Sequence, residues 1–142
     1  MAIDYGDTRT GVAISDLTRT ITGEAWVIEE RNPRALAKQL IAAARQRDVE
    51  MAALGYPRNM DGTLGPRAEV TQTFAETLRE MGLSVALWDE RRTTVDAHRI
   101  LTGTGRHGKK RKNRLDAVAA SLILEGYLAY LANHSEQTPP EQ

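Results

Sequence analysis

The amino-acid sequence predicts an α/β protein with one mixed five-stranded sheet and helices on both of its faces. Three observations support this fold class. Strand-like apolar runs occur three times before the first helical segment, and twice more between helical segments. The helical segments begin at recognisable capping or proline positions. A chain of 142 residues is long enough for one domain with a substantial core.

The first thirty residues contain three predicted strands. Residues 1–4 and 10–15 flank a polar turn that includes Asp7, and residues 24–28 follow the break at Gly23. Because such short links join neighbouring strands, we expect an antiparallel meander.

Two helices and two further strands follow in alternation. Asn32 and Pro33 indicate the start of the first helix, and an apolar strand is expected over residues 51–54. Pro66 begins the second helix, and residues 84–88 form the fifth strand. The predicted apolar faces of the two helices comprise Leu36, Leu40, Ala43 and Ala44 in the first, and Val70, Phe74, Leu78 and Met81 in the second.

The last third of the chain is predicted to end in one long helix. Residues 93–101 are compatible with a short helix, residues 103–114 read as a glycine-punctuated basic loop, and the final helix covers about residues 113–132. We expect residues 1–132 to form one domain and residues 133–142 to be a disordered tail. With right-handed crossovers, this order of elements matches the ribonuclease H-like fold, with three antiparallel strands followed by two parallel ones.

Composition excludes several classes of function. The chain has no cysteine, so disulfides and cysteine metal sites are absent, and its formal net charge is zero. The sequence shows no signal-peptide pattern, and no apolar run was expected to be long enough to span a bilayer. We therefore expect a cytoplasmic protein without a membrane partner.

Three acidic residues in separate elements are candidate metal ligands. Asp4 lies on the first strand, Glu90 follows the last strand, and Asp116 lies on the last helix, where Ala119 and Ala120 allow close approach to the sheet. Clustered carboxylates repel one another, and oxygen ligands favour Mg²⁺ or Mn²⁺. Two such ions roughly 4 Å apart suit hydrolysis of a phosphodiester bond.

Spacing alone leaves two alternatives open at this site. The acids could be unrelated surface or ion-paired residues. Asp89 also competes with Glu90, since adjacent strand residues face opposite sides of a sheet.

Basic and polar residues near these acids are candidate contacts to a nucleic-acid backbone. Clustered cations neutralise phosphates without reading sequence, although charge runs are also common on solvated surfaces. The candidates are Arg9, Asn59, Arg91, Arg92, Arg106, Lys109, Lys110, Arg111, Lys112 and Arg114.

Four stretches of the chain resemble the signature stretches of the YqgF family, whose members are described as pre-16S rRNA nucleases and as Holliday-junction-resolvase-like proteins. They are AIDYGDTRTGVAISD, LGYPRNMDGT, DERRTT and LDAVAASLIL, in that order. The resemblance implies a ribonuclease H-like fold, a metal-dependent nuclease site at Asp4, Glu90 and Asp116, and a role in maturing the 5′ end of 16S rRNA. Thr10 and Arg92 depart from the family pattern, in which aliphatic residues are usual.

The leading hypothesis is a Mg²⁺- or Mn²⁺-dependent endonuclease acting on structured RNA, as a monomer or homodimer. A resolvase of branched DNA would use the same architecture. A nucleic-acid-binding factor without catalysis would need only the basic segment. A nucleotide-binding domain is a fourth possibility, because residues 4–12 resemble the phosphate-binding hairpin of actin-like ATPases.

Overall fold

One five-stranded sheet organises the chain in strand order β3-β2-β1-β4-β5. The structure is a computed structural model that describes residues 1–56, 65–89 and 108–133, with the backbone alone described over 108–114. The strands are β1 (Ala2–Asp4), β2 (Arg9–Ser15), β3 (Thr22–Glu29), β4 (Met51–Tyr56) and β5 (Ser84–Asp89). The first three pair antiparallel, and β4 and β5 extend the sheet in parallel from β1. The predicted mixed sheet is therefore confirmed.

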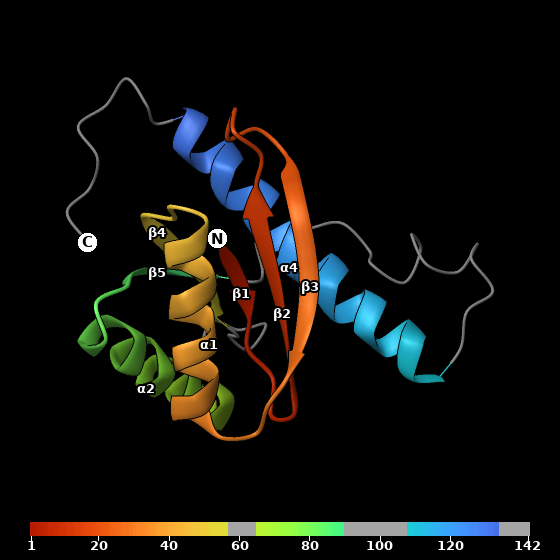
Figure 1. Cartoon of the computed structure of the whole chain (residues 1–142), viewed down its shortest axis with the longest axis vertical. Helices are drawn as coiled ribbons and strands as arrows, with labels where there is room; N and C mark the ends of the chain where they lie inside the picture. The colour runs from red at the N-terminus through yellow and green to blue at the C-terminus, as the bar shows by residue number, and fades with distance from the viewer. Residues whose placement is uncertain (57–64, 90–107, 134–142) are drawn as a thin grey trace.

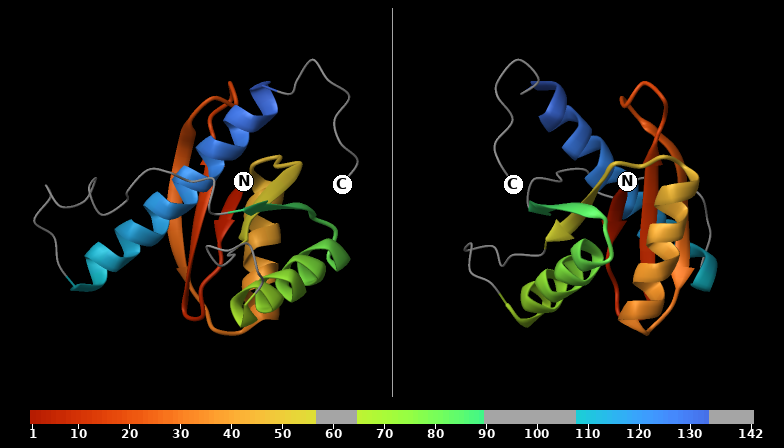
Figure 2. Two further views of the ribbon diagram at one scale, coloured as in Figure 1. Left: turned by 180° about the vertical axis from the view of Figure 1, so that it is seen from behind. Right: turned by 60° about the vertical axis from the view of Figure 1, so that its left-hand side comes forward.

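Helices cover both faces of this sheet (Figure 1). The helices α1 (Pro33–Gln46) and α2 (Pro66–Glu80) lie on one face, and α4 (Gly108–Asn133) crosses the other. Figure 2 shows α4 running diagonally across the strands when the molecule is seen from behind. Each face carries its own apolar cluster, so the central strands β2, β1 and β4 are covered on both sides, whereas the edge strand β3 is largely exposed.

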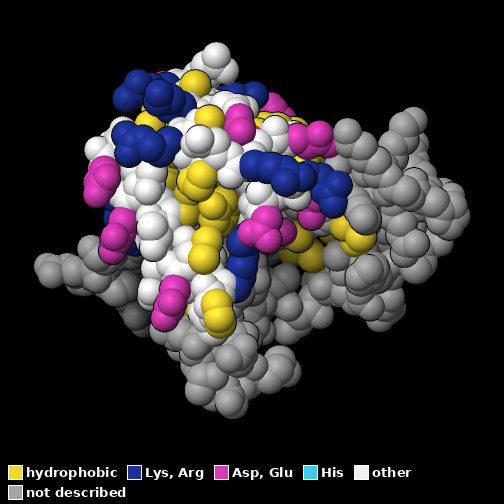
Figure 3. All heavy atoms as spheres, turned by 90° about the horizontal axis from the view of Figure 1, so that it is seen from below, with side chains coloured by type: hydrophobic (Ala, Val, Ile, Leu, Met, Phe, Trp, Pro, Cys, Tyr) yellow, Lys and Arg dark blue, Asp and Glu magenta, His cyan; other side chains and the backbone are white. Residues whose placement is uncertain are grey.

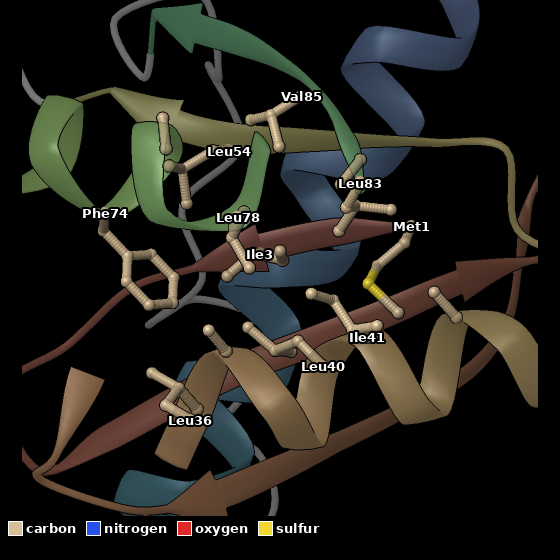
Figure 4. Close-up of a cluster of buried hydrophobic side chains, with 14 of the residues drawn as sticks. Met1, Ile3, Leu36, Leu40, Ile41, Leu54, Phe74, Leu78, Leu83 and Val85 are labelled. Carbon is tan, nitrogen blue, oxygen red and sulfur yellow. The ribbon is translucent and has the colours of Figure 1, made fainter. Parts of the chain in front are cut away.

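Alternation along the strands assigns each side chain to one of the two clusters. Ile3 of β1 contacts the cluster of α1 and α2, whereas Ala2 belongs to the cluster under α4. Figure 4 shows the first cluster, in which Leu40 of α1 and Leu78 of α2 surround Ile3. This parity decides which polar residues at the strand ends can share a site with α4.

Local signals account for the start of α1. The side chain of Asn32 accepts hydrogen bonds from the backbone N–H groups of Arg34 and Ala35, and Pro33 occupies the first helical position. The predicted start of this helix is therefore confirmed.

The predicted apolar face of α2 was partly wrong. Phe74 and Leu78 are buried, but Val70 is exposed, and the neighbouring Thr71 is buried instead. Thr71 can occupy the interior because its hydroxyl donates to the carbonyl of Arg67 one turn earlier. A hydrophobicity pattern cannot distinguish a surface threonine from a buried one whose hydroxyl is hydrogen-bonded to the backbone of its own helix.

The helix α4 begins earlier than the sequence suggested. Residues 108–112 were assigned to a basic loop, yet the backbone is helical from Gly108. Lysine and arginine are good helix formers, and extending an existing helix costs far less than starting one, so the packed part of α4 continues through the basic residues.

By length and composition alone, residues Leu115–Asn133 could cross a membrane, which corrects the expectation that no apolar run is long enough. In this fold the segment packs on the sheet. Its buried residues include Ala120, Ile123, Leu124, Tyr127 and Leu128.

Candidate active site

Asp4 lies at the end of β1 on the face of the sheet that α4 covers. Ala2, two residues earlier, packs in the cluster under α4, and alternation places Asp4 on the same side. Asp4 pairs in register with Gly11 of the antiparallel neighbour β2. The half-buried Asp4 is therefore directly beside the point where the helix crosses the sheet.

The helix crosses β2 in backbone contact at Gly11. A Cβ atom built on Gly11 would lie 2.0 Å from the carbonyl oxygen of Asp116 and 3.3 Å from Cβ of Ala120. Only glycine leaves room for this approach. The expected role of small residues is confirmed for Ala120, which is completely buried, but the decisive glycine on the strand was missed. A glycine inside a β-pattern is the signal that could have found it.

Arg9 forms an ion pair with Asp116 at the same place. Its Nε lies 3.3 Å from Oδ2 of Asp116, and the side chains are 29% and 31% exposed. Alternation along β2 puts Arg9 and Gly11 on the same face. Burial raises the pKa of the Asp116 carboxyl, and the charge of Arg9 partly opposes that rise. The net penalty on the charged carboxylate is what a bound cation would relieve.

The donor chemistry of this site fits a hard divalent cation. Asp4 and Asp116 offer carboxylate oxygens on one face, the preferred ligands of Mg²⁺ and Mn²⁺. Among the described residues no group of three potential ligands comes together. Glu90 lies outside the described residues, so the structure describes only Asp4 and Asp116 of the three predicted ligands.

The structure separates Asp89 from the other acids. Val85 of β5 packs in the cluster of α1 and α2, and alternation places Asp89 on that same face. Asp4 and Asp116 are on the opposite face. Of the two neighbouring acids, Glu90 is therefore the better candidate.

A family model described as "RuvX: Holliday junction resolvase" matches residues 1–130. The chain belongs to the RuvX family. This confirms the family resemblance drawn from the four sequence stretches and identifies the protein as an enzyme of the nuclease class.

Curated relatives of this RuvX-family chain agree over nearly its full length. A protein of Halothermothrix orenii is 46% identical over 132 residues, covering 92% of this chain and 94% of that protein. One from Desulfitobacterium hafniense is 41% identical over 138 residues, covering 96% of each. Both are named "Putative pre-16S rRNA nuclease".

A solved structure confirms the ribonuclease H-like fold. The RuvC protein of T. thermophilus, in complex with a Holliday junction substrate, matches with a TM-score of 0.55 at 12% identity. The match covers 90% of this chain and 92% of RuvC. At this identity the likeness establishes the fold.

The predicted nucleic-acid contacts fall mostly outside the described side chains. Asn59, Arg91, Arg92 and Arg106 lie outside the described residues. The backbone from Lys109 to Arg114 belongs to the start of α4 rather than to a loop, and its side chains are not described. Arg9 is the one candidate of this set whose contacts the structure describes.

The face seen from below in Figure 3 carries basic and acidic side chains intermixed around a strip of apolar ones. Among the described side chains on this face, no large patch carries a single sign of charge.

Proposed function

We propose that this protein is a divalent-cation-dependent endonuclease that cleaves structured RNA in the cytoplasm, in the maturation of the 5′ end of pre-16S rRNA. Residues 1–132 form the nuclease domain in this proposal. The observation that carries it is the contact at Gly11, which brings Asp116 next to the strand pair that holds Asp4. The names of the relatives from H. orenii and D. hafniense supply the substrate.

Asp4, Glu90 and Asp116 would hold Mg²⁺ or Mn²⁺ in this proposal. Ions bound there would supply an activated water and would stabilise the charge on the leaving oxygen. The chain's own contribution is to hold carboxylates on a sheet and a packed helix, which keeps their geometry fixed. Arg9 forms an ion pair with Asp116 in this structure, and with a cation on the carboxylate its guanidinium would be available to bind a phosphate.

The RNA backbone would be bound by the basic residues around the site. The early turns of α4 carry five cations within six residues, and only Leu115 separates this segment from Asp116; they are Lys109, Lys110, Arg111, Lys112 and Arg114. Arg91, Arg92, Arg106 and Asn59 complete the proposed contacts. Because such contacts read charge rather than sequence, we expect binding to weaken steeply with salt.

The test is cleavage of a precursor RNA that carries the 5′ extension of 16S rRNA, with and without EDTA. Asp4→Asn and Asp116→Asn are expected to slow cleavage by at least about a hundredfold, because a metal ion contributes several kcal/mol to such transition states. Asp89→Asn is the matched control, since Asp89 lies on the other face, and it should retain activity. Cleavage by Asp4→Asn at the wild-type rate would overturn the proposal.

Branched DNA is the second candidate substrate, favoured by the description of the family model as a Holliday junction resolvase. Symmetric cleavage of a four-way junction requires two sites related by a two-fold axis. A side-by-side assay with the precursor RNA and a four-way junction, combined with the mass of the protein in solution, distinguishes the two. A monomer that cuts only RNA excludes resolution.

A further inference from the structure

Arg67 links the first turn of α2 to the segment that follows Asp4. It is the second residue of that helix, directly after Pro66. Its Nη2 donates a hydrogen bond to the carbonyl oxygen of Tyr5, and its Nη1 lies 2.6 Å from Oδ1 of Asp7. One guanidinium group therefore holds two points of the turn between β1 and β2.

An aromatic stack holds the same guanidinium from another direction. The Arg67 Cζ atom lies 4.9 Å from the centroid of the Tyr5 ring, and that ring stacks on Phe74 at 4.1 Å. Phe74 is 2% exposed and belongs to the main apolar cluster. Only a planar group with several donors can hydrogen-bond at its edge while its face covers a ring, so lysine cannot replace arginine here.

The contact lies where β1 leaves the sheet. Asp4 is the last residue of β1 to pair with β2, and the next carbonyl along the chain is the one that Arg67 binds. Farther along the turn, the N–H of Gly6 donates to the hydroxyl of Thr10 over 3.4 Å, which is a long hydrogen bond. The direction of the chain just beyond Asp4 therefore depends on Arg67.

Resting on the proposed function, we propose that Arg67 is a positioning residue of the nuclease site, which keeps the Asp4 carboxylate in the orientation that binds the divalent cation. The N–H groups of its guanidinium donate to the Tyr5 carbonyl and the Asp7 carboxylate, and the flat face of the guanidinium lies over the Tyr5 ring. These contacts occupy it within the protein, so it acts through Asp4 and does not bind the RNA.

The experiment measures Mn²⁺ binding directly, by electron paramagnetic resonance of the free ion, together with cleavage at increasing Mn²⁺. Arg67→Lys is expected to raise the Mn²⁺ dissociation constant roughly tenfold, as for other residues that orient metal ligands. Excess Mn²⁺ should restore most of kcat, and KM for RNA should remain unchanged. A merely structural role would lower thermal stability without moving the Mn²⁺ midpoint.

Arg79→Lys is the matched control. Arg79 lies near the other end of the same helix and also donates to a strand carbonyl, that of Val85, at 2.9 Å. It should lose comparable thermal stability and keep the wild-type Mn²⁺ midpoint. Equal midpoints for Arg67→Lys, Arg79→Lys and the wild type would overturn the inference.

Asp7→Asn keeps the inference testable if Arg67→Lys does not fold. The Asp7 side chain is 90% exposed, so this variant should fold, and its Mn²⁺ midpoint should rise about twofold. An unchanged midpoint in that variant would then count against the inference. If the wild type binds no Mn²⁺, or if Asp4→Asn is fully active, the proposed function fails. If the wild type binds Mn²⁺ and Asp4→Asn is inactive, but the Arg67 variants behave as wild type, only the inference fails.

Discussion

Gly11 of β2 and Asp116 of α4 are in backbone contact, with the Asp116 carbonyl oxygen 2.0 Å from where a Cβ of residue 11 would lie. This contact joins the two parts of the candidate active site. A single methyl group added at residue 11 would therefore push α4 away from β2 and disturb the site.

Gly11→Ala is expected to lower the free energy of unfolding by about 1–3 kcal/mol, because the helix must move away from the strand. The same movement displaces Asp116, so nuclease activity should fall together with stability. Urea unfolding and a cleavage assay check both effects.

Gly126→Ala is the matched control for that substitution. Its Cβ would lie 3.2 Å from Cζ2 of Trp88, so this ring would have to move by only a few tenths of an ångström, and alanine is the better helix former. We expect its free energy of unfolding to stay within about 1 kcal/mol of wild type. Equal losses in both variants would show that the contact at Gly11 has no special role.

Divalent cations should stabilise the folded protein. At a Mn²⁺ concentration of a hundred times the dissociation constant, binding adds about 2.7 kcal/mol to the free energy of unfolding, and EDTA should remove this gain. Thermal unfolding of the wild type, Asp4→Asn and Asp116→Asn measures it. Stabilisation of equal size in all three proteins would place the cation elsewhere.

Arg9→Met should tighten cation binding while weakening RNA binding. Arg9 is the positive charge beside Asp116, and removing this partly exposed ion pair should lower the Mn²⁺ dissociation constant by about two- to fivefold. Calorimetry with Mn²⁺ and filter binding with RNA separate the two effects. Arg31→Met is the control, since Arg31 lines the same surface hollow as Arg9 without a described contact to Asp116. Weaker Mn²⁺ binding in Arg9→Met would contradict the prediction.

The tip of the β2–β3 hairpin should loosen in acid. Asp16 accepts hydrogen bonds from the Thr18 hydroxyl and from the N–H groups of Thr20 and Ile21, and these bonds lower the pKa of its carboxyl. A lowered folded-state pKa means that the stabilisation is complete above the unfolded value of about 3.9 and is lost as the pH falls through the folded value.

The amide proton shifts of Thr20 and Ile21, followed by NMR between pH 6 and pH 2, report this loss. They should titrate together with the Asp16 carboxyl at a pH below the ordinary range of aspartate. In Asp16→Asn the same shifts should stay flat. A midpoint at or above the ordinary value would show that the turn does not hold the carboxylate.

Residues that act through their near neighbours in the chain could be predicted. Asn32 and Pro33 mark the start of α1 because a cap acts on N–H groups two and three residues away. The prediction that Val70 lies on the buried face of α2 was wrong, because the burial of a helix residue depends on which surface the helix packs against. Thr71 is buried in its place since its hydroxyl is satisfied by the backbone of its own helix.

By itself the sequence determined the order and type of the five strands and of the helices α1, α2 and α4, the family and the choice of candidate acids. These depend on local propensity, capping and motif. The tertiary structure alone decided that Gly11 admits Asp116, that Arg9 pairs with that acid, that Arg67 holds the chain beyond Asp4, and that Asp89 lies on the other face. Each of these depends on which surfaces meet when α4 and α2 pack on the sheet, and residues separated by 60 or more positions have no local signal for that meeting.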